Sequence, residues 1–319
     1  MKKSLLSILA LTALFSVANA QQTSDEATKN VNVIKSSNTD TTEGWTKGGV
    51  FGVNFGQVHL ENWQGGGQSN ISANTLFSAY RNYKKGKRAW DNSLDMSYGI
   101  VSLDGQDFIK SDDRIEINSK YGQQFNNNKK WYYGGLLNFR SQFAPGFNYE
   151  TEPVMTRTLL SRVMSPAYLT AALGFDYKPN AALSVFIAPL SYRGTFVLDD
   201  NLNSIGAFGV DSNTSVRHEV GGLLMVKYQK EDIFKIKNVG LKTQATFFSN
   251  YLDRPQNIDV LWDVLINMKV NKYITASIAT SLVYDHDILL PLTLDDGTEF
   301  NGRRVQFKEV LNIGFSYKF

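Results

Sequence analysis

The C-terminal segment of this 319-residue chain alternates apolar and polar residues and ends on a phenylalanine. One face carries Val305, Phe307, Leu311, Ile313, Phe315, Tyr317 and Phe319, and the other carries Arg304, Gln306, Lys308, Asn312, Ser316 and Lys318. A period of two predicts a β-strand whose two faces meet different surroundings. In a transmembrane β-barrel the apolar face meets lipid and the polar face meets the lumen, which fits this segment.

The preceding chain divides into further segments of the same kind, many of them alternating at period two. We predict a single-chain, all-β antiparallel up-and-down barrel of about 12 strands, an even number as in bacterial outer-membrane barrels. The approximate strands are 47–60, 70–83, 88–101, 114–125, 130–142, 166–178, 181–193, 216–229, 238–251, 258–270, 273–284 and 303–319. The first, seventh and eighth of these alternate less regularly than the others.

The connections between the predicted strands alternate in length. Every second connection is a short turn, at 84–87, 126–129, 179–180 and 271–272, with a longer exception at 230–237. The others include long loops at 143–165, 194–215 and 285–302, and shorter loops at 61–69, 102–113 and 252–257. Short turns at one end and longer loops at the other are typical of outer-membrane barrels, whereas a soluble sandwich has no reason to sort its loops.

The N-terminus has the three parts of a secretory signal peptide. Lys2 and Lys3 form a basic start, an apolar stretch covers residues 5–17, and Ala18-Asn19-Ala20 fits an A-x-A cleavage site. The apolar stretch is shorter than the roughly 20 residues that a membrane-spanning helix needs. We therefore expect residues 1–20 to be removed, so that the mature chain acts beyond the inner membrane.

Residues 21–44 are rich in Thr, Ser, Asn and Asp and are expected to form a flexible periplasmic segment before the barrel at 45–319. A small plug is the alternative for this segment. Cysteine is absent, which excludes thiol chemistry and cysteine-ligated metal. The formal charge of +3 falls to +1 when the two signal-peptide lysines are removed (3 − 2), which argues against a nucleic-acid partner.

The ending Tyr317-Lys318-Phe319 resembles the C-terminal signal by which bacterial outer-membrane barrels are recognised for insertion. We therefore expect Tyr317 and Phe319 to form an insertion signal, with the barrel-assembly machinery and outer-membrane lipid of a Gram-negative bacterium as partners. The last strand then runs toward the periplasm, which makes the short turns periplasmic and the long loops external. Aromatic rings with polar tips favour the membrane interfaces. The candidates are Trp45, Trp90 and Trp131 on the periplasmic side and Trp63, Trp262 and Tyr284 on the outer side.

Several motifs are similar to those of one protein family. They are Asn62-Trp63-Gln64-Gly65-Gly66-Gly67, Met164-Ser165-Pro166-Ala167-Tyr168-Leu169, Leu173-Gly174-Phe175-Asp176-Tyr177-Lys178-Pro179-Asn180, Phe186-Ile187-Ala188-Pro189-Leu190 and Gly206-Ala207-Phe208-Gly209-Val210. They resemble a group of Bacteroidota outer-membrane proteins, the family labelled "domain of unknown function 3078", over most of residues 45–319. The resemblance implies an outer-membrane barrel in a Bacteroidota-like envelope. It implies no reaction, substrate or catalytic residue.

The inward faces of the predicted strands carry charges of both signs. The candidate lumen-lining residues are Asp91, Asp95, Arg140, Lys227, Lys242, Asp259, Asp263, Lys269, Arg304 and Lys308. Charges inside a barrel either line an aqueous path or pair across it and close the lumen. The leading hypothesis is a non-enzymatic barrel that passes or binds small solutes through a narrow, charge-lined lumen.

A structural barrel that docks a surface or envelope partner through its outer loops is the alternative. The loops at 143–165 and 194–215 carry the apolar residues Phe147, Val154, Leu159, Leu160, Ile205 and Phe208. Exposed apolar clusters mark contact sites. Loops that pack onto each other or plug the lumen would explain the same residues as well.

An envelope hydrolase is the third hypothesis. The histidines are His59, His218 and His286, and the nearest grouping for hydrolysis is Ser215, His218 and Glu219. Adjacent strand residues point to opposite faces, so His218 and Glu219 are not expected to line one site. We therefore predict no enzyme, no catalytic residue and no cofactor.

The last long loop concentrates residues that could bind a hard cation such as Ca²⁺. These are Asp285, His286, Asp287, Asp295, Asp296 and Glu299. Their spacing does not match a glycine-anchored cation loop, so a solvated acidic loop is the favoured interpretation and no metal site is predicted. The triplet Gly65-Gly66-Gly67 lacks the strand–helix context of a phosphate loop and is interpreted as a loop tip.

Overall fold

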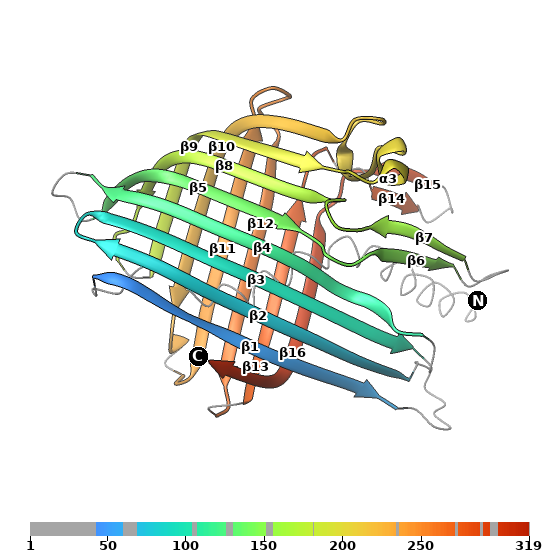
Figure 1. The fold of residues 1–319 in the computed structure, drawn as a ribbon, viewed down its shortest axis with the longest axis horizontal. Coiled ribbons are helices and arrows are strands. Elements are labelled where there is room, and N and C mark those ends of the chain that lie inside the picture. Colours follow the sequence, from blue (N-terminus) through green and yellow to red (C-terminus); the bar gives the residue numbers. More distant parts are fainter. Residues whose placement is uncertain are drawn as a thin grey trace, which may run out of the picture.

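The computed structural model of the chain describes residues 43–59, 69–103, 107–125, 130–150, 156–180, 182–233, 236–271, 274–287, 290–293 and 299–318. Within these ranges, twelve long antiparallel strands form one closed barrel (Figure 1). They are β1 (Gly44–Val58), β2 (Asn70–Lys85), β3 (Arg88–Leu103), β4 (Ile109–Gln124), β5 (Trp131–Ser141), β8 (Ala167–Tyr177), β9 (Leu183–Phe196), β10 (Val216–Lys230), β11 (Val239–Asn250), β12 (Ile258–Lys269), β13 (Ile274–Tyr284) and β16 (Gln306–Lys318). Pairing of β1 with β16 closes the ring. The predicted all-β, twelve-stranded antiparallel barrel is confirmed.

Short turns join the strands at one end of the barrel, here called the turn end, and longer connections join them at the other, the loop end. The turn end connects β2 to β3, β4 to β5, β8 to β9, β10 to β11 and β12 to β13. In the described ranges the loop end carries six further short elements: β6 (Gly146–Glu150), β7 (Thr156–Ser161), α3 (Asp200–Ser204), η1 (Ala207–Gly209), β14 (Leu290–Thr293) and β15 (Glu299–Gly302). No helix in the described ranges is long and apolar enough to span a membrane.

The barrel wall separates two chemically different faces. Apolar side chains point outward, where Leu173 is 61% exposed and Phe175 and Ile187 are also exposed. Polar side chains alternate with them and point inward, where Asp95 and Glu219 are only 4% and 1% exposed. A closed sheet leaves no unpaired backbone edge, and its apolar outer band suits lipid. The protein is an outer-membrane β-barrel.

A bulge in β9 changes which of its residues face inward. The register with β10 shifts between Gly221 and Leu223, and the register with β8 shifts between Leu173 and Phe175. Both shifts lie beside Pro189, which has no N–H to donate to a regular ladder and is therefore accommodated at an irregularity. Before the bulge the buried side chains of β9 are those of Ser184, Phe186 and Ala188, and after it they are those of Ser191 and Thr195.

Substitution on the outward face tests the contact with lipid. Leu173→Arg should lower the free energy of unfolding by about 2–4 kcal/mol, because an arginine near the bilayer midplane must be desolvated. Ile205→Arg is the matched control, since Ile205 is 74% exposed in a loop-end connection. The measurement is the urea midpoint of each variant in lipid vesicles. Equal midpoints for the two variants would show that the Leu173 face does not meet lipid.

Candidate functional site

The lumen holds a cavity of about 330 Å³ that is lined by charged and polar side chains. Its lining comes from β3, β4, β5 and β8 to β13. Lys178 and Gln229 border it toward the turn end, and Arg217 and Asp285 border it toward the loop end. The cavity therefore follows much of the barrel's length. Its volume lies in the range of about 300–1,000 Å³ that is typical of small-molecule sites.

Part of the predicted lumen set lines this cavity, namely Asp91, Asp95, Arg140, Lys227, Asp259 and Asp263. Lys242 is buried on β11 but does not border the cavity. Lys308 lies on β16 opposite Ser281, and its side chain is outside the described part of the structure.

Two further residues of the predicted lumen set do not border the cavity. Lys269 is exposed at the last position of β12, and Arg304 is exposed in the connection before β16. Lys269 is still paired with Thr275, but it ends β12 at the exposed rim of the turn end. The predicted strand 303–319 began before β16, so Arg304 lies where alternation no longer decides which way a side chain points.

Polar groups in the middle of the cavity are bonded along the wall. Ser78 of β2 donates to Asp95 of β3 at 2.6 Å. Asn138 of β5 donates to both Glu116 and Asn118 of β4 at 2.7 Å. These bonds join neighbouring strands, so they hold the polar side chains against the wall and do not bridge the lumen.

Near the turn end, lysines surround a buried aspartate. Lys120 of β4 donates to Asp176 Oδ2 at 2.5 Å, and Lys178 Nζ lies 3.3 Å from the same oxygen. Ser184 of β9 donates to Asp176 Oδ1 at 2.7 Å. Both carboxylate oxygens are thus occupied, which makes Asp176, although only 4% exposed, a satisfied buried charge.

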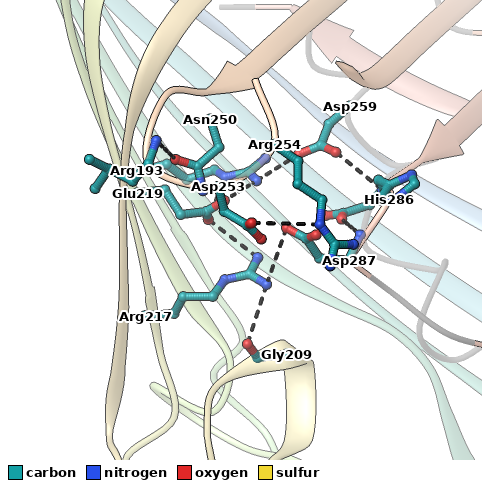
Figure 2. A network of polar contacts seen from close by, with 12 residues as sticks. Arg193, Gly209, Arg217, Glu219, Asn250, Asp253, Arg254, Asp259, His286 and Asp287 are labelled. Carbon is teal, nitrogen blue, oxygen red and sulfur yellow. Dashed lines mark hydrogen bonds and ion pairs between the residues drawn. The ribbon is translucent and has the colours of Figure 1, made fainter. Parts of the chain in front are cut away.

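At the loop end, arginines and acids form the network drawn in Figure 2. Arg193 of β9 donates to both carboxylate oxygens of Glu219, at 2.8 and 2.6 Å, and to Asp259 of β12 at 2.7 Å. Arg217 of β10 lies 3.2 Å from Glu219. A bidentate arginine–carboxylate pair is both strong and geometrically specific. The network therefore fixes the relative positions of β9, β10 and β12.

The same network fastens two loop-end connections to the wall. Arg217 donates to the Gly209 carbonyl oxygen at 3.3 Å and lies 4.0 Å from Asp287 (Figure 2). The His286 backbone N–H donates to Asp259 at 3.2 Å. Beside these contacts, burial and then the Asp259 carboxylate raise the pKa of Asp285 above its usual range. Protonation of Asp285 would reduce the excess of acids at this end.

The apolar residues of the outer loops largely pack on each other. Val197, Leu202 and Val210 form a buried cluster against which Leu159 and Phe208 pack. The connection between β5 and β8 and the connection between β9 and β10 are therefore parts of one packed unit at the loop end. Three other residues were considered for partner docking and are described: Ile205 is 74% exposed, Phe147 lies under the Arg157 guanidinium and Leu160 is half-buried. Val154 is outside the described ranges.

Asp199 joins these two connections by a polar contact. It caps α3 by accepting from the backbone N–H groups of Asn201 and Leu202, and Arg162 donates to it at 2.9 Å. Burial alone would raise the pKa of Asp199, but the bonds from Arg162 and then from the two amides lower it below its usual range. The ionised carboxylate is therefore the form that holds the loops together.

The sequence interpretation missed several cavity charges: Arg114, Glu116, Lys120, Lys178, Arg193 and Arg217. Those of β4 were detectable, since Arg114, Glu116 and Lys120 alternate with apolar or aromatic outward residues. Arg193 was hidden by the bulge in its strand, which reverses the alternation after Pro189.

The hydrolase grouping is not assembled. His218 is exposed on the outer face and contacts the Tyr192 hydroxyl at 2.8 Å, whereas Glu219 points inward to the arginines. Ser215 accepts from Asn203 at 3.0 Å. His59 is exposed beyond the end of β1.

No set of three metal-ligating residues gathers within the described ranges. The acidic residues of the last long loop were weighed as calcium ligands and interpreted as a solvated loop. Asp295 and Asp296 fall outside the described ranges, as do Gly65-Gly66-Gly67, and the side chain of Glu299 is not described. The prediction that no metal is bound there stays a prediction.

Three of the described tryptophans lie toward the turn end and one lies nearer the loop end. Trp45 packs 5.0 Å from Tyr83 and 6.0 Å from Trp90 toward the turn end, and Trp131 packs 4.7 Å from Tyr177 there. Nearer the loop end, Trp262 donates to Thr243 at 2.9 Å, whereas Tyr284, at the end of β13, borders the cavity. Trp63 and Phe319 lie outside the described ranges, and the side chain of Tyr317 is not described.

A family model described as "Protein of unknown function (DUF3078)" matches residues 55–147 of the chain. The match supports the family resemblance and includes the motif at 62–67. The other motifs that carry the resemblance, from 164 to 210, lie beyond it. A search of curated proteins finds no match.

Solved structures of outer-membrane proteins resemble the chain weakly. The translocator domain of the autotransporter NalP from Neisseria meningitidis has a TM-score of 0.40 at 10% identity, covering 97% of this chain and 98% of that one. The COG4313 outer membrane channel from Pseudomonas putida F1 has a TM-score of 0.40 at 11% identity, covering 89% and 100%. Outer membrane phospholipase A from Escherichia coli has a TM-score of 0.32 at 10% identity, covering 91% and 97%. These proteins are a translocator, a channel and an enzyme, and likenesses this low carry no argument about function.

The loop-end network should be necessary for barrel stability. Glu219→Gln removes the charge that Arg193 and Arg217 share, so the free energy of unfolding should fall by about 3–5 kcal/mol, as when one partner of a buried ion pair is removed. Asp253→Asn is the control, because the Asp253–Arg254 pair is 3.8 Å long and both side chains are exposed; it should cost about 0–1 kcal/mol. Urea unfolding in detergent micelles measures both. A similar small loss in the two variants would contradict a structural role for the network.

Proposed function

We propose that this outer-membrane barrel is a non-enzymatic channel that passes or binds small polar solutes through its charge-lined lumen. The observation that carries the proposal is the cavity of about 330 Å³, whose lining extends from the turn end toward the loop end. Contacts such as Asn138–Glu116 and Lys120–Asp176 hold the charged groups against the wall. Charges of both signs along one path suit hydrophilic solutes rather than a single type of ion.

We further propose how the chain is exported and how the barrel is oriented in the outer membrane. Residues 1–20 act as a cleaved signal peptide, residues 21–44 as a periplasmic lead-in, and Tyr317 with Phe319 as the signal to the barrel-assembly machinery. The turn end then faces the periplasm of a Bacteroidota-like envelope. The exposed Trp45, Trp90 and Trp131 would lie at the periplasmic membrane interface, and Trp262 and Tyr284 at the outer interface.

A structural barrel that docks a protein partner is the second candidate. It is favoured by Val163, Leu198 and Ile205, which are 52%, 51% and 74% exposed on the packed loop-end connections. An envelope hydrolase is third, and no observation on Ser215, His218 and Glu219 favours it.

Single-channel recording of the refolded protein in planar lipid bilayers tests the leading proposal. Discrete conductance steps are expected, and Met225→Trp should reduce their size, because Met225 borders the cavity and the larger indole would occupy part of it. Val226→Trp should leave the steps unchanged, since the next residue of β10 points to the outer face.

Absence of steps from protein that is inserted and heat-modifiable on gels would reject the channel and favour the docking barrel. Equal conductance of the two tryptophan variants would show that ions do not pass through this cavity.

A further inference from the structure

Two opposite charges face each other across the lumen near the turn end without forming an ion pair. Asp91 on β3 and Lys227 on β10 both border the cavity, and their strands lie five positions apart in the ring of twelve described strands. Asp91 is paired across the strands with Lys120, and Lys227 with Ser184, while Lys120 and Ser184 both donate to Asp176. The two groups therefore lie at the same level of the lumen, on either side of Asp176, with no ion pair between them.

Both groups lack hydrogen-bond partners among the described residues. Asp91 is 8% exposed, and its buried Oδ1 accepts no hydrogen bond from them. The Lys227 ammonium donates none to them and forms no ion pair with them. A buried charged group without a partner is costly, so this pair is suited to a ligand that supplies one donor and one acceptor.

The surrounding charges are already occupied. Asp176 accepts from Lys120 and Ser184 and pairs with Lys178, as described above. A second pocket of about 10 Å³ adjoins Asp91, Lys120, Asp176 and Lys178. The loop-end network differs, because Arg193 and its acids bind one another directly. Asp91 and Lys227 are thus the pair that remains for a ligand.

Charge balance selects the kind of ligand. A simple cation near Asp91 would approach Lys120, Lys178 and Lys227, and a simple anion near Lys227 would approach the Asp91 carboxylate and leave its buried Oδ1 without a donor. Like charges in a poorly solvated site repel strongly. A small molecule that carries both signs a few bonds apart avoids both penalties.

We propose that the turn-end half of the lumen binds a small zwitterion with a carboxylate and an ammonium group, as in an α-amino acid. The ligand carboxylate accepts from Lys227, with Lys178 beside it, and the ligand ammonium donates to Asp91. This inference rests on the proposed channel function and names the class of solute that the channel takes.

Equilibrium dialysis of the full-length, detergent-refolded protein with radiolabelled alanine tests the site. Propionate and ethylamine are matched competitors, because each keeps the small carbon skeleton and lacks one of the two charges. Alanine should bind saturably, and each competitor should bind about 10-fold to 100-fold more weakly, the effect of losing a charged hydrogen bond.

Substitutions test the roles of Asp91 in binding the ligand ammonium and of Lys227 in binding the ligand carboxylate. Asp91→Asn and Lys227→Met should each weaken alanine binding by about 10-fold to 100-fold. Lys269→Met, at the exposed end of β12, is the control and should leave it unchanged. Asp91→Asn should also strengthen propionate binding relative to alanine, an effect that loss of folding would not produce. Heat-modifiability on gels confirms that each variant is folded.

The outcomes separate this site from the channel itself, since dialysis requires no conduction. Propionate binding as tight as that of alanine would overturn the zwitterion in favour of a plain anion site. Absence of saturable alanine binding, or unchanged binding in both variants, would also overturn it. Conductance steps without alanine binding would reject only this site, and alanine binding without conductance would reject only the channel.

Discussion

Closure of the backbone hydrogen-bond ladder is the constraint on which the rest of this structure depends. In lipid each unpaired N–H or C=O group is costly, so a sheet must return to its first strand. Here β16 pairs with β1, from Val50 opposite Lys318 to Asn54 opposite Gly314. Once the ring is closed, each strand residue points either to lipid or to the lumen. Alternate side chains along each strand therefore face two different environments, lipid outside and the lumen inside.

The interior shows how a barrel accommodates charges in a confined space. At the loop end Arg193, Glu219 and Asp259 bind each other directly, and through Arg217 the network reaches Gly209 in the neighbouring connection. In the middle, Asn138 and Glu116 bond along the wall. Near the turn end, Asp91 and Lys227 remain without a partner among the described residues. Both ends of the cavity thus contain bonded charges, and the turn end also contains two charged groups that the described residues leave without a partner.

The accuracy of the sequence predictions followed the regularity of the pairing. On β12 the strict alternation placed Asp259 and Asp263 at the cavity, as predicted. On β9 the bulge beside Pro189 exchanged the two faces, so Arg193 was not recognised. At Arg304 the alternation was extended past the end of β16, and Lys269 ends β12 at its exposed rim. On β10 the alternation is regular around His218, so His218 and Glu219 point to opposite faces and the hydrolase grouping is not formed, as expected.

The sequence alone determined the architecture. Period-two segments joined alternately by short turns and longer loops define strand number and antiparallel order, because these features are local and repeat along the chain. Only the tertiary structure decided which charges meet. Asp91 and Lys227 are 136 residues apart (227 − 91) and border the same cavity because the ring places β3 almost opposite β10. Their relation depends on strand order, register and a bulge, and short-range alternation contains no information about distances across the lumen.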